Sequence, residues 1–89
     1  MSVLQKIKEL INENKLEKAL ESLDCELMKD ENDSLYFERG KLHWRMGNKR
    51  LAISDYERAV ALNAQSPAKI ALENARYIMN FYDTNLYNP

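Results

Sequence analysis

The fold is decided by residues 33–66, which read DSLYFERGKLHWRMGNKRLAISDYERAVALNAQS. On either side of Gly47, apolar and small residues recur at every third or fourth position, which is the spacing of one face of a helix. These residues are Tyr36, Phe37, Gly40, His43, Trp44 and Met46 before the glycine, and Ala52, Ile53, Tyr56, Ala59, Val60 and Leu62 after it. Gly47 readily adopts the left-handed conformation that ends a helix, and Asp33 or Ser34 can cap the start of the first helix. The stretch therefore predicts one antiparallel helical hairpin.

Residues 1–32 predict a second hairpin of the same kind. An apolar stripe indicates a helix from Val3 to about Asn12, and the pair Ser2 and Gln5 forms a capping-box pattern at its start. The break is expected at residues 12–14, because Asn tolerates the left-handed conformation better than most residues. A second stripe follows and ends at the polar cluster 29–33; its members are Leu16, Ala19, Leu20, Leu23 and Leu27.

A fifth helix is expected over residues 67–83, followed by a tail of residues 84–89. Ser66 is a favoured N-cap, and Pro67 belongs at the first helical position. Its broad apolar face is formed by Ala68, Ala71, Leu72, Ala75, Ile78, Met79 and Tyr82. The whole chain has only two Gly and two Pro, so its composition disfavours turns and sheets and favours helices. We therefore predict an all-α protein, one domain over residues 1–89, with about five helices.

The two hairpins align with each other at an offset of 33 residues, which places Ile7 on Gly40 and Leu23 on Tyr56. A unit that cannot bury its own apolar face is stable only when it is stacked on a neighbour. Gly40 and Ala52 fall on the facing stripes of the second hairpin, and a small side chain there lets two helix axes approach closely. We expect these two residues at the closest helix crossing.

The pattern Tyr36-x-x-Arg39-Gly40-x-x-His43, then Gly47, then Ala52-x-x-x-Tyr56 and Ala59, resembles the tetratricopeptide repeat. The resemblance implies a right-handed stack of antiparallel helical hairpins. It gives a degenerate repeat over residues 1–32, a full repeat over 33–66 and a solvating C-terminal capping helix over 67–83.

Three residues depart from the family pattern. Arg39 stands in place of Leu, His43 in place of Tyr, and Ala64 in place of the Pro expected at the end of the repeat. We expect Arg39 to lay its aliphatic stem on the first hairpin and to keep its charged head in water. His43 is interpreted as a hydrogen-bonded or half-buried residue between helices rather than a metal ligand, because the chain has one His and one Cys.

In the family that the chain resembles, the first helices of successive hairpins line a groove that accepts peptide segments of partner proteins. The corresponding positions here are Leu4, Lys8, Ile11 and Asn12, then Phe37, Lys41, Trp44 and Arg45, then Ala71, Ala75, Ile78 and Met79. Six of them are the candidate partner-binding residues: Lys8, Asn12, Phe37, Lys41, Trp44 and Arg45. An alternative reading makes Trp44 part of the core, packed against the fifth helix.

The expected partner is a protein or peptide segment with an acidic residue near a large apolar one. A cation at Lys41 or Arg45 would hold the carboxylate, and the Trp44 ring would cover the apolar side chain. The alternative function is self-association, through an uncovered end of the stack or through the aromatic face, so the chain is expected to be a monomer or a weak homodimer. No cofactor is expected.

Charge and composition argue against other functions. Residues 1–33 hold five Lys and nine Asp or Glu, whereas residues 34–89 hold eight Lys or Arg and five Asp or Glu, so the halves carry −4 and +3. Without a basic run longer than Lys49-Arg50, nucleic-acid binding is not expected. No membrane-spanning or signal segment is predicted, so the expected location is the cytoplasm. One His and one Cys do not supply the groups of most catalytic or metal sites, and we expect no enzymatic activity.

Overall fold

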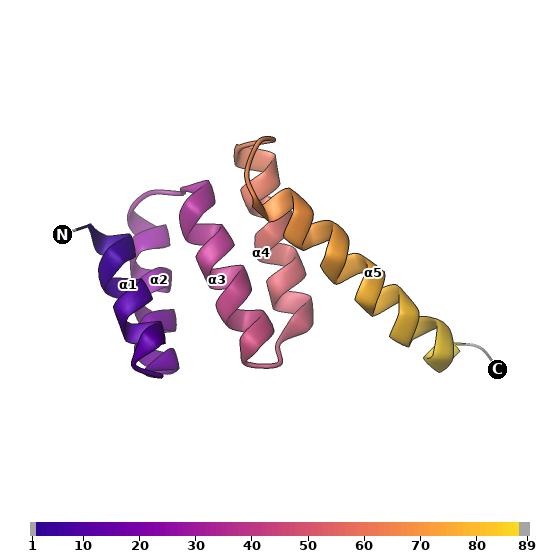
Figure 1. The fold of residues 1–89 in the computed structure, drawn as a ribbon. Coiled ribbons are helices and arrows are strands. Elements are labelled where there is room, and N and C mark those ends of the chain that lie inside the picture. Colours follow the sequence, from indigo (N-terminus) through magenta and orange to yellow (C-terminus); the bar gives the residue numbers. More distant parts are fainter. Residues whose placement is uncertain (1, 88–89) are drawn as a thin grey trace.

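Five helices make up the computed structural model, which describes residues 2–87, with side chains from residue 2 to residue 81. The helices are α1 (Val3–Asn12), α2 (Leu16–Lys29), α3 (Asp33–Arg45), α4 (Lys49–Leu62) and α5 (Ala68–Tyr87). They follow one another along an elongated stack, with α1 and α2 at one end and α5 at the other (Figure 1). Residues 2–87 contain no strand. The all-α stack of helical hairpins is confirmed, and no helix of the described part is long and apolar enough to cross a membrane.

The turns inside both hairpins form where the sequence predicts them. Ser2 caps α1, because its Oγ accepts a hydrogen bond from the backbone N–H of Gln5 at 3.1 Å. Asn14 adopts a φ of 62° between α1 and α2, and Gly47 a φ of 88° between α3 and α4. Both residues are of the types that tolerate the left-handed region, so the chain reverses there at little cost.

Two predicted helix boundaries are wrong, the N-cap of α3 and the end of α5. The N-cap of α3 is Asn32 rather than Asp33 or Ser34: Asn32 has extended backbone, and its Oδ1 accepts hydrogen bonds from the N–H groups of Ser34 and Leu35. The predicted cap of the fifth helix is confirmed: Ser66 Oγ accepts a hydrogen bond from the Ala68 N–H at 3.1 Å, and the helix starts at Ala68, one residue after the predicted start at Pro67.

This fifth helix also continues to Tyr87, past the predicted end at residue 83. No Gly or Pro interrupts residues 68–88, and Thr and Asn lower helix propensity by less than about 1 kcal/mol each. Of the predicted tail, residues 84–87 are helical and residues 88–89 lie outside the described residues.

The core consists of two apolar clusters, and α2 and α3 contribute residues to both. The first joins α1, α2 and α3 and contains Ile7, Ala19, Leu23 and Leu42. The second joins α2, α3, α4 and α5 and contains Leu27, Tyr36, Ala52, Tyr56, Ala59, Ala68, Leu72 and Ala75. Because α3 contributes to both, each hairpin packs on the next, and α5 closes the second cluster with three buried residues of its own.

The contact between α3 and α4 is made possible by the small residues predicted for it. A Cβ added at Gly40 would lie 2.6 Å from Tyr56 Cε1 and 3.3 Å from the Ala52 carbonyl oxygen. Ala52 is fully buried, and Tyr56 is only 4% exposed. No larger side chain fits at Gly40 unless the buried Tyr56 ring moves.

A direct test of this contact compares two identical substitutions in α4. Ala52→Leu adds three carbons to a filled core, and we expect it to lower the free energy of unfolding by about 1–3 kcal/mol. Ala61→Leu, at an exposed position of the same helix, should change it by less than about 0.5 kcal/mol. Urea denaturation measures both values, and equal midpoints would contradict the placement of Ala52.

A buried ion pair joins α3 to α4 and corrects the prediction for Arg39. The Arg39 guanidinium donates to both oxygens of Asp55, Nε at 2.9 Å and Nη2 at 2.8 Å, and its Nη1 donates to Asp24 of α2 at 2.9 Å. The side chains of Arg39 and Asp55 are 19% and 5% exposed. The head of Arg39 is therefore inside the stack rather than in water, because two carboxylates replace the water it would lose. The hydrogen bond to Asp55 is also the main cause of the raised pKa of Arg39.

His43 lies beside this ion pair. It is 9% exposed, and its Nε2 is 3.7 Å from Asp55 Oδ2. His43 therefore lies between helices, as predicted. It is almost fully buried rather than half-buried.

Candidate functional site

The first part of the candidate site is a depression between α1 and α3. It consists of two adjoining hollows of about 210 and 240 Å³ that share Ile11, Glu38 and Lys41. Together we call them the α1/α3 hollow; its lining residues are Lys8, Ile11, Asn12, Glu38, Lys41, Leu42 and Arg45. One turn of α3 separates Lys41 from Arg45, so both side chains are presented on the side of the helix that faces α1.

The second part, which we call the α3/α5 hollow, lies on the other side of α3. It has a volume of about 190 Å³ and is lined by Trp44, Tyr56, Ala71, Asn74, Ala75 and Ile78. None of these six side chains carries a charge. Helix α3 thus separates an apolar hollow from one that is rich in charged side chains.

The α1/α3 hollow has an excess of positive charge. Within the described part of the chain, Lys8 and Arg45 form no ion pair, so both charges are available to a ligand. Lys41 Nζ lies 3.0 Å from Oε2 of Glu38, whose side chain is 8% exposed. Three cations and one carboxylate leave this hollow with a formal charge of +2.

Trp44 is in contact with both the core and a surface hollow. It is half-buried and packs against the core cluster that α5 completes, and it also lines the α3/α5 hollow. The cation over its ring is Lys49, with Nζ 5.3 Å from the ring centre. Because one part of the indole is fixed by packing, the remaining part forms a rigid wall of the hollow.

The six predicted site residues are divided between these places. The α1/α3 hollow gathers Lys8, Asn12, Lys41 and Arg45, and the α3/α5 hollow contains Trp44. Phe37 lines neither hollow: it is half-buried, its ring centre lies 6.1 Å from that of Tyr56, and Lys41 Nζ lies 4.6 Å from it.

Sequence reasoning missed four lining residues, Glu38, Leu42, Tyr56 and Asn74. Glu38 could have been found, since it precedes Lys41 by three residues and i,i+3 pairs of opposite charge meet on one helix face.

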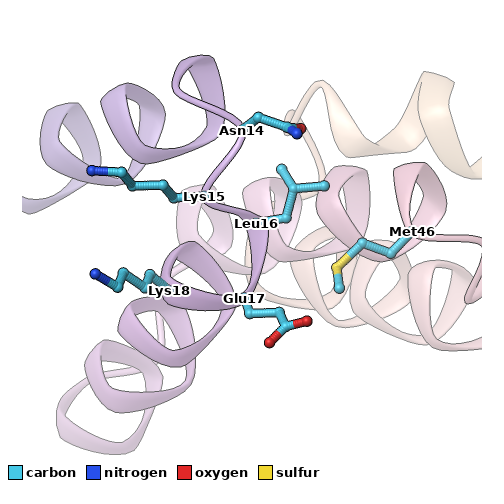
Figure 2. Close-up of a pocket in the computed structure, with 6 residues that line it drawn as sticks. All are labelled: Asn14, Lys15, Leu16, Glu17, Lys18 and Met46. Atoms are coloured by element: carbon cyan, nitrogen blue, oxygen red, sulfur yellow. The ribbon is translucent and has the colours of Figure 1, made fainter.

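A larger depression of about 390 Å³ lies at the turn between α1 and α2 (Figure 2). Figure 2 shows Leu16 and Met46 pointing toward each other there, while Lys15 and Lys18 point away. Its lining combines the apolar pair Leu16 and Met46 with the polar side chains of Asn14 and Glu17.

No group of three or more His, Cys, Asp or Glu side chains among the described residues is arranged to hold a metal ion. The single Cys25 is exposed on α2 with a free thiol.

The repeat architecture agrees with two comparisons. The family model of the tetratricopeptide repeat matches residues 33–66. The solution NMR structure of protein BF1650 from Bacteroides fragilis has a TM-score of 0.85 and 36% sequence identity, over 99% of this chain and 91% of that one. The chain belongs to the tetratricopeptide repeat family. No curated protein matches it significantly. As a tetratricopeptide repeat protein, the chain is a protein–protein interaction module.

Proposed function

We propose that this module binds one extended or helical segment of a partner protein across α1, α3 and α5, and that it has no enzymatic activity. The observation that carries the proposal is the pair of hollows on the two sides of α3, one basic and one apolar. The sole histidine, His43, lines neither hollow, so neither contains an imidazole for acid–base chemistry.

The basic hollow selects for an acidic residue in the segment. Lys8 and Arg45 have no carboxylate partner within the described part of the chain, whereas Lys41 is held by Glu38. A carboxylate of the ligand would therefore be attracted first to Lys8 and Arg45. Each exposed ion pair contributes only about 0–1 kcal/mol, so these contacts set specificity and association rate more than affinity.

The apolar hollow supplies most of the binding energy. Its wall is the fixed indole of Trp44, and its small residues Ala71 and Ala75 leave room for a Leu or Phe side chain. Trp is the residue type most often found at the energetic centre of interfaces, because it removes a large apolar area from water. The partner is therefore a segment with a large apolar residue close to an acidic one.

The test uses peptides selected on the purified protein from a random library. Trp44→Ala is expected to weaken a selected acidic–apolar peptide by about 2 kcal/mol, or roughly thirtyfold, because the wall of the apolar hollow is removed. Isothermal titration calorimetry measures the change in the binding free energy of the peptide. Because Trp44 also packs on the core, circular dichroism must show that the variant remains folded.

A second variant tests the basic hollow without touching the core. Arg45→Glu reverses an exposed charge in the α1/α3 hollow and should weaken the same peptide by about 1 kcal/mol and reduce its salt dependence. The matched control is Arg50→Glu, the same reversal at an exposed position of α4. If the two reversals have equal effects, or if selected peptides carry no acidic residue, the basic hollow does not select the partner.

A further inference from the structure

The α1/α3 hollow contains a buried carboxylate among its cations, and the proposed function does not yet use it. Glu38 is 6% exposed, whereas Lys8 and Arg45 are exposed residues. Glu38 and Lys41 line both of the adjoining hollows, while Arg45 lines one of them and Lys8 the other. A ligand group placed in either hollow therefore lies in the same space as Glu38.

Each of the two adjoining hollows carries a formal charge of +1. One is lined by Lys41, Arg45 and Glu38, and the other by Lys8, Lys41 and Glu38. A single Asp or Glu side chain of a ligand brings either hollow to neutrality. A phosphoserine carries a charge of about −1.5 to −2 at pH 7, so it would leave excess negative charge beside Glu38.

Lys41 is not free to neutralise this excess. Its Nζ lies 3.0 Å from Oε2 of Glu38 and 4.6 Å from the centre of the Phe37 ring. An anion that drew Lys41 away would leave the Glu38 carboxylate, whose side chain is 8% exposed, without this ion pair. Leaving a buried charge uncompensated is strongly unfavourable. Each hollow therefore offers one free cation, which suits a group with one negative charge.

Burial also makes the charge of Glu38 more effective than the charges of the free cations. Water and salt screen Lys8 and Arg45, because both are exposed. Charges inside the protein interact more strongly, because the effective dielectric constant there is lower. The repulsion between Glu38 and a second negative charge is therefore screened less than the attraction of that charge to Lys8 or Arg45.

We infer that Glu38 restricts the α1/α3 hollow to a single carboxylate, so that it accepts an Asp or Glu of the partner segment and gives no advantage to a phosphorylated Ser or Thr. The inference rests on the proposed function, because it concerns the acidic residue of the same segment. With volumes of about 210 and 240 Å³, the hollows have room for either group, so the selection depends on charge. Glu38 is a specificity-determining residue that acts by disfavouring extra negative charge.

The test compares three versions of one peptide selected on the purified protein, with Asp, Asn or phosphoserine at its acidic position. Isothermal titration calorimetry at about pH 7.5, where the phosphate is mainly a dianion, measures the three affinities for the natural chain. The Asp peptide should bind up to about fivefold more tightly than the Asn peptide, as one exposed ion pair allows. The phosphoserine peptide should bind no more tightly than the Asp peptide.

The variant Glu38→Gln removes the negative charge and keeps nearly the same size of side chain. It also frees Lys41, so the phosphoserine peptide should now bind at least about fivefold more tightly than the Asp peptide. Glu21→Gln, the same substitution at an exposed position of α2, is the matched control and should keep the selectivity of the natural chain. The readout is a ratio of two affinities, which a purely structural role of Glu38 would not change.

Two results would overturn the inference and leave the proposed function intact. In the first, the natural chain binds the Asp peptide better than the Asn peptide, but binds the phosphoserine peptide at least about fivefold better still. In the second, Glu38→Gln and Glu21→Gln have the same ratio of affinities. The first comparison needs no variant, so it decides the question even if Glu38→Gln does not fold. Equal affinity of the natural chain for the Asp and Asn peptides would instead contradict the proposed function, and the inference with it.

Discussion

A chain that ends at Ser66 is expected to lose cooperative folding, because α5 closes the second core cluster. Its residues Ala68, Leu72 and Ala75 are at most 7% exposed, and they cover Tyr56 and Ala59 of α4. An 89-residue domain has only about 4–13 kcal/mol of stability in total. Exposing this side of α4 to water would remove most of this free energy of unfolding. The shortened chain should therefore aggregate.

A chain that ends at Phe81 is the control for this truncation. It keeps all three buried residues of α5 and should unfold cooperatively, with a small loss of stability. Circular dichroism during urea denaturation, with sedimentation to detect aggregates, measures both chains. A chain ending at Ser66 that stays monomeric and fully helical would show that α5 is dispensable for the core.

The second large effect is expected at the buried ion pair. Asp55→Ala leaves the Arg39 guanidinium inside the stack without its main partner, and it removes the carboxylate nearest to His43. Breaking a buried pair by removing one member costs about 3–5 kcal/mol. We expect about 3 kcal/mol here, because Arg39 is 19% exposed and still has Asp24 within reach.

The matched control removes the other carboxylate of the same arginine. Asp24 accepts from Arg39 at the same distance of 2.9 Å as one of the Asp55 contacts, but its side chain is 54% exposed. Asp24→Ala should therefore cost no more than about 1 kcal/mol of unfolding free energy. If guanidinium denaturation gives the same loss for both variants, burial does not determine the contribution of this ion pair.

The helices could be predicted because their determinants are local. Apolar spacing fixes α1 to α5, and Asn14 and Gly47 mark the turns through backbone conformations that few residues tolerate. The N-cap of α3 could not be predicted, because Asn32, Asp33 and Ser34 are all residue types that favour this position. The backbone conformation of the loop before α3 determines which of them is the cap. The far end of α5 was missed since no Gly or Pro marks it.

The polar interior was harder to predict, although part of its signal is in the sequence. Asp55 follows Ala52 by three residues and precedes Ala59 by four, so it lies on the buried side of α4. Because Asp55 is charged, a search for the buried face that uses only apolar residues does not include it. Arg39 turns inward because it forms an ion pair with Asp55 of the neighbouring helix. A single sequence does not show which charged residues of two helices will face each other.

The candidate site was predicted in part for the same reason. Family correspondence identified Lys8, Asn12, Lys41 and Arg45, which the structure gathers in one hollow. It also assigned Trp44 to the groove, and the structure places Trp44 in a separate hollow beside α5. The exposure of Ile70, Tyr77 and Phe81 was not predicted, because more than one side of α5 has apolar residues at helical spacing. Periodicity alone does not show which of the two sides is covered by the neighbouring helix.

The most direct test of the proposed groove is a map of amide chemical shifts on the isotope-labelled chain. It is titrated with a selected peptide and with the same peptide carrying Lys in place of its acidic residue. The acidic peptide should shift signals of α1, α3 and α5, with the Trp44 indole and the Arg45 amide among the largest changes, and the Lys peptide should bind more weakly. Shifts confined to α2 and α4, or equal affinity for the two peptides, would contradict binding in the groove.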